Sequence, residues 1–275
     1  TADGSGITAY DGAIVEANRN TISGAAEGSG FGIRSSIVTA NNNIIGPIGG
    51  WNGLWIYGTS DVSAENNTIQ DTAKEAVLIG EYHFNDQGWN VPTPTAARLY
   101  FANNQISNNT GVCNSQMYDG DFACPAIHMF MSSATLYDNT VTNNGGDGMR
   151  IKGSIVNAQR NTMEVSGFAA NISHYDDNYG SKYGSIAYFS GNSYSNASQI
   201  YNITESRVTV QSEYIPDAGG NELYPVQLRW LGPECPYVLD ECLLVPSTAV
   251  MPPAFMPLAL EVIDNSTVFS YANLQ

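Results

Sequence analysis

Three short segments of the chain place aromatic or basic side chains at every second position, between apolar residues. They are residues 54–57 (LWIY), 127–130 (IHMF) and 149–152 (MRIK). Such alternation is typical of a β-strand with one face in the core, so the intervening side chains point outward. If the three strands lie side by side, one outer face collects these residues: Trp55, Tyr57, His128, Phe130, Arg150 and Lys152. Arg34, in the similar segment 31–34, falls at one end of that face.

A face of this composition suits an anionic ligand that is built of rings. The chain carries 26 acidic and 10 basic residues and a formal charge of −16, so two neighbouring cations are a local exception. Sugar rings stack on aromatic side chains, and carboxylates pair with guanidinium groups. We therefore expect a groove for acidic polysaccharide, whose binding residues are Trp55, Tyr57, Phe130 and Arg34. The alternative is that the aromatic residues only pack under loops while Arg150 and Lys152 pair with nearby carboxylates, which stabilises a surface very little.

The elements that would carry this face are coils of a repeat marked by asparagine. An asparagine followed by any residue and then an apolar or aromatic one recurs at steps of 23, 24, 37, 35, 22 and 31 residues. The short steps match one coil of a solenoid, and the long steps match a coil with an insertion. The repeated residues are Asn20, Asn43, Asn67, Asn104, Asn139, Asn161 and Asn192.

The flanks of each asparagine alternate between apolar and polar residues, as Val15, Ala17 and Ile22 do around Asn20. The gap of three between Ala17 and Asn20 indicates a corner in the chain. An inward asparagine at such a corner can bond both the backbone of the bend and the equivalent asparagine one coil away. The sequence thus predicts a buried asparagine ladder.

These Asn-x-apolar corners, over residues 10–215, resemble those of the pectin-lyase-like superfamily of parallel β-helices. The resemblance implies an all-β, right-handed parallel β-helix of about eight or nine coils, as a single domain over residues 1–275. Residues 10–215 would form the regular coils, and 216–275 the terminal coils with a Pro- and Cys-rich capping loop. The pattern weakens after Asn192: residues 208–215 fit an eighth coil with Glu213 at the asparagine position, and 260–265 fit a ninth.

The resemblance also suggests a reaction, although the same fold hosts lyases, hydrolases, adhesins and structural spikes. In pectate-lyase-like enzymes, an Arg or Lys on such a face removes the proton beside a uronate carboxylate that Ca²⁺ neutralises. Here Arg150 or Lys152 would be the base and His128 a proton donor. The calcium candidates are Asp119, Asp121 and Asp147. This chain departs from the pattern, because no signature ties acidic ligands to the strand, and the outward rows lack the carboxylate pair that glycoside hydrolysis requires.

Three insertions are expected to project from the coils, at residues 81–96, 111–125 and 173–184, and the first two are expected to form the walls of the groove. The second of them contains Cys113 and Cys124, and a second local pair is Cys235 with Cys242. Local disulfides are the favoured pairing; metal ligation is the alternative, but there is no C-x-x-C spacing and the histidines do not cluster with the cysteines. Disulfides would place the chain in an oxidising compartment, so a secreted, extracellular or cell-surface protein is expected.

The composition of the chain argues against two classes of partner, nucleic acid and the membrane interior. Clustered basic residues are missing, which argues against nucleic acid, and no apolar stretch is long enough for a membrane span. The leading hypothesis is a secreted β-helix that binds acidic polysaccharide or a cell-surface glycan and cleaves it by β-elimination, with Ca²⁺ as the possible cofactor. The rival is a non-catalytic adhesin, sheath or filament subunit that self-associates. A third alternative is one domain of a larger polypeptide.

Overall fold

The computed structural model describes residues 4–84, 90–93, 97–113, 122–176, 182–204, 206–211 and 213–215, and six short strands between residues 221 and 271. Strands and turns make up these segments. Within them there is no helix long and apolar enough to cross a membrane.

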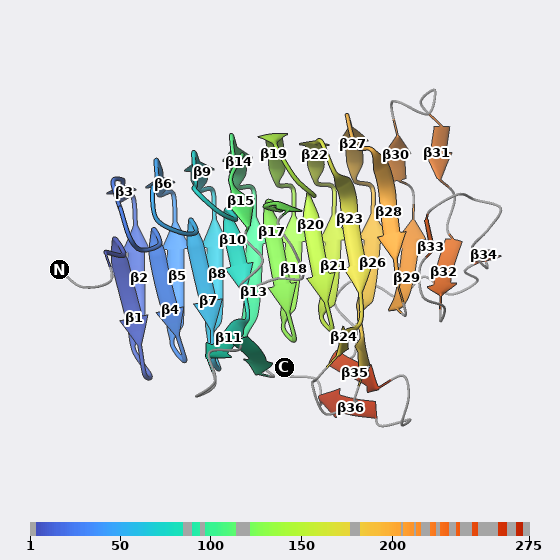
Figure 1. Ribbon diagram of the computed structural model, residues 1–275, viewed down its shortest axis with the longest axis horizontal. Helices are drawn as coiled ribbons and strands as arrows, with labels where there is room; N and C mark the ends of the chain where they lie inside the picture. Colours follow the sequence, from blue (N-terminus) through green and yellow to red (C-terminus); the bar gives the residue numbers. More distant parts are fainter. Residues whose placement is uncertain are drawn as a thin grey trace.

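Three parallel sheets run along the molecule, and each coil of the chain adds one strand to every sheet, as Figure 1 shows. Sheet A contains β1 (Ile7–Tyr10), β4 (Phe31–Arg34), β7 (Leu54–Tyr57), β10 (Val77–Ile79), β17 (Ile127–Phe130), β20 (Met149–Lys152), β23 (Phe168–Ser173) and β28 (Gln199–Ile203). Sheet B contains β2 (Ile14–Asn18), β5 (Ile37–Asn41), β8 (Asp61–Glu65), β13 (Arg98–Ala102), β18 (Ser133–Tyr137), β21 (Ile155–Gln159), β26 (Ile186–Ser190) and β29 (Ser206–Gln211). Sheet C contains β3 (Thr21–Ile22), β6 (Ile44–Ile45), β9 (Thr68–Gln70), β14 (Gln105–Ser107), β19 (Thr140–Asn144), β22 (Thr162–Val165), β27 (Ser193–Ser195) and β30 (Glu213–Ile215). The predicted parallel β-helix is confirmed, with eight parallel coils.

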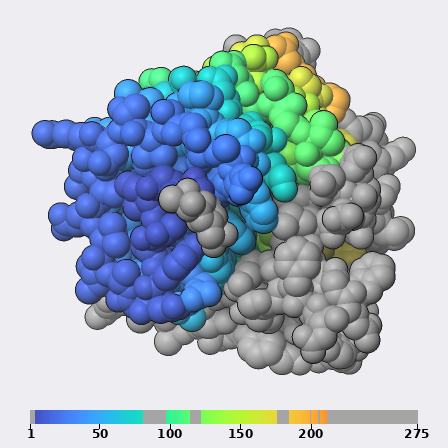
Figure 2. Space-filling model, turned by 60° about the vertical axis from the view of Figure 1, so that its left-hand side comes forward, coloured from blue at the N-terminus to red at the C-terminus, as the bar shows by residue number. Residues whose placement is uncertain are grey.

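The core lies between the three sheets and follows the predicted alternation. In β5, Val38 and Ala40 are buried while Ile37 is exposed, and the following coils repeat the two buried positions. One continuous apolar cluster runs from the first coil to the eighth, and its large members include Phe31, Phe101 and Phe189. Each coil therefore stabilises its neighbours through stacked side chains, as expected for a solenoid. In Figure 2 the first coils, in blue, form the near end of this stack.

The corner between sheets B and C depends on a residue in the left-handed conformation directly before each repeated asparagine. Its φ lies between 52° and 64° in all seven coils that carry the asparagine. These residues are Arg19, Asn42, Asn66, Asn103, Asp138, Arg160 and Gly191. Asn, Asp and Gly tolerate this conformation best, which explains why they occupy five of the seven places. The extra corner residue is the cause of the three-residue gap in the sequence.

The asparagine ladder forms as predicted. Nδ2 of Asn43 donates to Oδ1 of Asn67 at 2.9 Å and to the carbonyl oxygen of Ala17 at 2.8 Å. The backbone N–H of Asn43 donates to the same Oδ1 at 2.9 Å. The side-chain contact repeats from Asn20 to Asn192, and all members after Asn20 are buried.

A second ladder, of serines at the corner between sheets A and B, was not predicted. The backbone N–H of Ser154 donates to Oγ of Ser185, and that of Ser185 to Oγ of Ser206. Ser36 bonds Ser60 in the same way. Ala97 takes the place of the serine in the fourth coil. Its carbonyl oxygen accepts a hydrogen bond from the N–H of Ser133, just as the carbonyl oxygen of Ser132 in the next coil accepts one from the N–H of Ile155. The ladder is therefore interrupted there.

The C-terminal end differs from the prediction in two ways. Residues 258–262 do not form a ninth coil: β35 (Leu258–Val262) lies in an antiparallel sheet with β24 (Tyr175–Asp176), β25 (Lys182–Gly184) and β36 (Val268–Tyr271). Second, the described part of the predicted capping segment contains short strands, and the rest of residues 231–257 lies outside the described residues. Short antiparallel strands extend the three sheets there: β31 (Asn221–Leu223), β32 (Val226–Trp230), β33 (Cys235–Pro236) and β34 (Leu244–Pro246). Antiparallel pairing satisfies the open edge of the last coil.

The insertions form antiparallel hairpins rather than irregular loops. β11 (Glu81–Phe84) pairs with β12 (Asn90–Thr93), and β15 (Val112–Cys113) pairs with β16 (Phe122–Ala123). The third insertion holds β24 and β25. All three leave the coils next to sheet A, so they decide which part of that sheet stays accessible.

Candidate functional site

The outer face of sheet A carries the predicted rows of side chains. Strand pairing places Trp55, Leu78, His128 and Arg150 in adjacent positions of successive strands. It places Phe130 beside Lys152 in the parallel row and Arg34 beside Tyr57. The register of the predicted face is therefore correct.

The middle of this face is covered by the described parts of the second insertion, residues 111–113 and 122–124, which we call the covering loop. A disulfide joins Cys113 to Cys124 and closes the loop. Both cysteines are fully buried and pack with Leu78 and Phe130 of sheet A. The predicted groove wall is thus a lid that divides the face into two open ends.

His128 is not the surface proton donor that we expected, because it lies under this loop with no exposed area. Its Nδ1 lies 2.9 Å from Oε1 of Glu75, which is equally buried. Oε2 of the same carboxylate accepts a hydrogen bond of 2.8 Å from Nδ2 of Asn52. Burial lowers the pKa of His128 to about 4, against the opposing effect of Glu75. The imidazole is therefore neutral near pH 7 and is shielded from any external substrate.

Phe130 and Tyr57 also differ from their expected role as exposed binding residues. Phe130 is 1% exposed, because it packs against the disulfide. Tyr57 is 7% exposed and stacks on Trp55 with ring centroids 4.6 Å apart. Both residues support neighbouring side chains rather than offer a surface of their own.

An aromatic group lies on the N-terminal side of the covering loop, exposed at one residue and buried at another. We use this name for Tyr10, Trp51, Trp55 and Tyr57. The ring centroids of Trp51 and Trp55 are 5.3 Å apart, and those of Tyr10 and Tyr57 are 6.5 Å apart. Tyr10 is exposed, and both tryptophans are half-buried.

Two cations stand over this aromatic group. Nζ of Lys74 lies 4.7 Å from the ring centroid of Trp51, and the guanidinium carbon of Arg34 lies 5.1 Å from that of Tyr10. Arg34 also makes a bidentate ion pair with Asp11, at 2.7 and 3.2 Å. Gly32 lies between Thr8 and Trp55 in the outward row, so the sheet has no side chain at that position. The result is an aromatic surface with positive charge at its margin.

The basic end lies on the C-terminal side of the covering loop; we use this name for Arg150, Lys152, Asp147 and Asn171. The guanidinium of Arg150 lies 4.0 Å from the ring centroid of Phe122, which is part of the loop. Oδ1 of Asp147 accepts a hydrogen bond from the backbone N–H of Phe168, and Oδ2 accepts one from Nδ2 of Asn171. Burial raises the pKa of Asp147, against the effects of that N–H and of Arg150.

Some of the predicted calcium ligands and cysteines lie in the described part of the chain, and others lie outside it. Asp147 keeps its place as a calcium candidate, but Asp119 and Asp121 lie outside the described residues. The pair Cys235–Cys242 also lies outside them, since Cys242 is not described. The Cys113–Cys124 disulfide is confirmed.

The sequence prediction missed Glu75, Trp51 and Lys74. Each lies in the turn before a sheet A strand, outside the alternating segments that drew attention. A signal was nevertheless present. Glu75 stands directly before the buried run 76–79, where a charged residue is out of place unless it is paired.

The comparison with protein families agrees with the fold. The family described as "Right handed beta helix region" matches residues 2–154, just over half of the chain. No curated protein matches this chain significantly. A solved structure from Geobacillus virus E2, ORF18, superimposes with a TM-score of 0.40 at 12% identity, over 94% of this chain. The chain spans 62% of that protein's length.

Proposed function

The chain belongs to the right-handed β-helix family, and from that premise we propose that it binds acidic polysaccharide at the aromatic group of sheet A. The observation that carries this proposal is the position of Lys74 and Arg34 above the rings of Trp51 and Tyr10. A uronate residue needs both an apolar ring face and a cation beside it, and this end of the sheet offers both.

The charge of the protein makes this position significant. With a formal charge of −16, most of its surface repels an anionic polymer. Arg34 is already neutralised in part by Asp11, so Lys74 is the cation that we expect to contact a sugar carboxylate. Binding by such a small cationic site depends on ionic strength, because salt weakens the attraction between exposed charges. The screening length is about 10 Å at 0.1 M salt.

The covering loop sets the size of the site. Trp55 and Arg150 are three strands apart in one row, which corresponds to about 14 Å. The buried disulfide and Phe122 lie between them. The aromatic group and the basic end therefore act as separate surfaces, and we propose a short binding site over the first three coils.

Cleavage by β-elimination at the basic end is a second candidate. It is favoured by Arg150, Lys152 and the half-buried carboxyl of Asp147, which lie together there. In this scheme Lys152 or Arg150 takes the proton beside the uronate carboxylate. Asp147 would contribute to holding a Ca²⁺ ion, which would supply the charge that neutralises that carboxylate. His128 takes no part, since it is enclosed under the covering loop.

Two measurements separate these candidates from a non-catalytic surface or filament role. Calorimetric titration with an oligouronate and with its methyl ester tests binding; we expect binding of the acid form alone, weakened by added salt. Ultraviolet absorbance of unsaturated uronate products, with and without Ca²⁺, tests cleavage. Equal affinity for the acid and the ester would reject the proposed site, and self-association without glycan binding would favour the filament role.

We also propose that the protein works outside the reducing interior of the cell. The Cys113–Cys124 disulfide supports this location, because such bonds persist in oxidising compartments. Its loop closes over buried groups of sheet A, so the oxidised form is the one that has the surface described above.

A further inference from the structure

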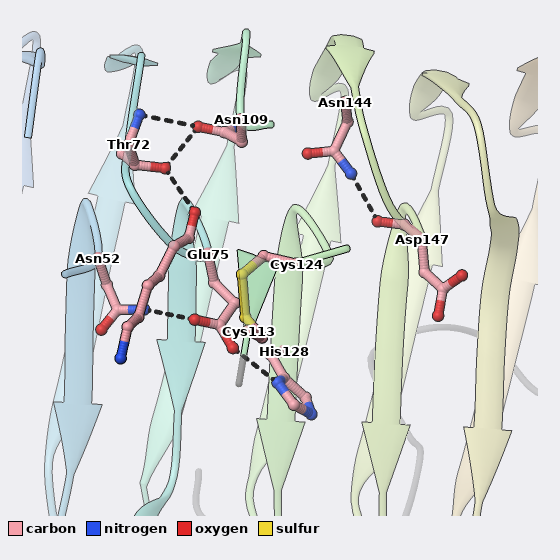
Figure 3. The surroundings of a disulfide bond; sticks show 10 residues. Asn52, Thr72, Glu75, Asn109, Cys113, Cys124, His128, Asn144 and Asp147 are labelled. Atoms are coloured by element: carbon pink, nitrogen blue, oxygen red, sulfur yellow. Dashed lines mark hydrogen bonds and ion pairs between the residues drawn. A yellow bond between two sulfur atoms is a disulfide. The ribbon is translucent and has the colours of Figure 1, made fainter. Parts of the chain in front are cut away.

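The Cys113–Cys124 disulfide lies against a buried carboxylate. An oxygen of Glu75 and the two sulfur atoms all lie within 4.8 Å of one another, and all three residues are buried. Figure 3 shows Glu75 between Asn52 and His128, with the disulfide beside it. This is an unusual place for a carboxylate, since burying a charge is costly unless its oxygens are well satisfied.

The oxidised form does not explain why a carboxylate faces the sulfur atoms. A disulfide has no hydrogen to donate to a carboxylate oxygen and carries no positive charge. Thiolates and carboxylates, in contrast, are both ligands for zinc, which binds sulfur at about 2.3 Å and oxygen at about 2.0–2.2 Å. Ligand atoms that already lie within 4.8 Å need only small movements to reach a common ion.

We propose that Glu75, Cys113 and Cys124 form a redox-gated site for a thiophilic divalent cation, of which zinc is the best fit. The disulfide is the closed, metal-free state of this site. After reduction, the two sulfurs and one carboxylate oxygen supply three ligands, and water completes the tetrahedron. The site is separate from the aromatic group and does not depend on the proposed glycan binding.

The residues around Glu75 suit this role. Nδ1 of His128, at 2.9 Å, and Nδ2 of Asn52, at 2.8 Å, hold the two carboxylate oxygens from opposite sides. Such outer contacts fix the orientation of metal ligands and commonly change metal affinity by about 10–100-fold when removed. His128 and Asn52 would therefore act as positioning residues.

The backbone keeps the two thiols close after reduction. The N–H of Cys124 donates to the carbonyl of Gly111 at 2.9 Å, and Cys113 pairs with Phe122 in the hairpin of β15 and β16. These contacts do not involve the sulfur atoms. The hairpin can thus keep its shape while the bond between the sulfurs opens.

The chemistry balances with an external reductant, either a dithiol or a phosphine with one molecule of water, which supplies the two protons and the oxygen of the phosphine oxide. A dithiol gives two electrons and two protons to the disulfide, which becomes two thiols, while the dithiol closes into its own disulfide. The metal ion then displaces one proton from each thiol, and both thiolates bind it. In the reverse direction, a small-molecule disulfide takes two electrons from the two thiolates and two protons from water and becomes a dithiol, which leaves the two sulfurs joined and releases the ion.

The test compares the full chain before and after reduction with a phosphine in oxygen-free buffer. Reduced protein should bind one equivalent of Zn²⁺ by native mass spectrometry, and Co²⁺ should give the visible bands of a tetrahedral thiolate site. Oxidised protein should bind neither ion. Glu75→Gln should weaken Zn²⁺ affinity by about tenfold or more, and His128→Asn should weaken it with unchanged band positions.

The matched control is the double variant C113S/C124S, which keeps the size of both side chains and removes both sulfur ligands. It should not bind Zn²⁺ in either condition. Equal binding by this variant, or a folded reduced protein that takes up no metal, would overturn the proposal. If reduction unfolds the chain, Zn²⁺ added during reduction should preserve its β-sheet circular dichroism, and failure to do so would equally reject the site.

Discussion

Nδ1 of His128 lies 2.9 Å from Oε1 of Glu75, and neither side chain reaches solvent. His128 lies in the outward row of sheet A, and Glu75 lies in the turn before β10, in another coil. Their contact lies beneath the covering loop. It shows that an outward position in a β-helix is not the same as a surface position. The loop, closed by its disulfide, converts the centre of sheet A into a second small core.

The buried imidazole makes stability depend on pH. Its pKa is lowered to about 4 in the folded chain from 6.5 in the unfolded one, so the unfolded state binds the proton more readily. The contribution of the neutral imidazole to the free energy of unfolding is complete above about pH 6.5. It is lost as the pH falls toward 4, and the total loss is about 3 kcal/mol. Urea unfolding of the oxidised protein at pH 7 and pH 4.5 measures the change.

His128→Asn provides the comparison for this pH effect. The variant retains an N–H donor that can reach Glu75 but has no group that titrates in this range. Between pH 7 and pH 4.5, we expect the free energy of unfolding to fall in both proteins. The fall should be about 2 kcal/mol smaller in the variant than in the wild type. Identical pH profiles would show that His128 is accessible to protons, contrary to its burial.

The asparagine ladder should contribute measurably to stability. Asn67→Ala removes Oδ1, which accepts bonds from the side chain and backbone of Asn43, and leaves those donors buried. We expect a loss of about 1–3 kcal/mol in the free energy of unfolding. Asn18→Ala, at an exposed position, is the control and should change it by less than about 0.5 kcal/mol. Equal losses in the two variants would argue against a special role for the ladder.

The interrupted serine ladder can be repaired. Ala97→Ser places a hydroxyl between Ser60 and Ser132, where the other coils have one. The variant should gain about 0.5–1 kcal/mol, because a buried backbone N–H acquires an acceptor. Ala64→Ser, which buries a hydroxyl within the apolar core, is the contrasting variant and should lose stability. Thermal unfolding followed by circular dichroism compares them, and a loss in both would show that the fourth corner has no room for a hydroxyl.

The basic end makes a separate prediction about cleavage. If β-elimination occurs there, Arg150→Ala and Lys152→Ala should lower the formation of unsaturated uronate by at least tenfold, whereas Trp51→Ala should act mainly through binding. Arg207→Ala, on the outer face of sheet B, serves as a control for loss of a positive charge. Activity that survives in both strand variants would remove Arg150 and Lys152 from the reaction.

The coils were predictable because their signals are local and repeated. Val15, Ala17 and Asn20 recur in one register, and stacking then fixes all three sheets. The ninth coil was wrong because Leu258–Val262 alternates in the same way in a hairpin as in a coil. Alternation identifies a strand but not its partner.

The site was less predictable because it depends on where an insertion folds. Nothing in residues 111–125 states whether the loop stands beside sheet A or lies over it. The burial of His128 and Phe130 follows from that choice alone. Trp51 and Lys74 lie in turns without periodicity, so only their spatial contact reveals them.

The most direct test of the proposed function is calorimetric titration of an acidic oligouronate into the wild type and Trp51→Ala. Trp51 belongs to the aromatic group but to neither apolar cluster, so its removal should leave the fold intact. Tyr100→Ala, an exposed aromatic residue on sheet B that contacts Tyr137, is the matched control. We predict that Trp51→Ala weakens binding by about tenfold, as loss of a contact worth about 1.4 kcal/mol requires, while Tyr100→Ala binds like the wild type. Equal affinity in all three proteins would contradict the placement of the glycan site on sheet A.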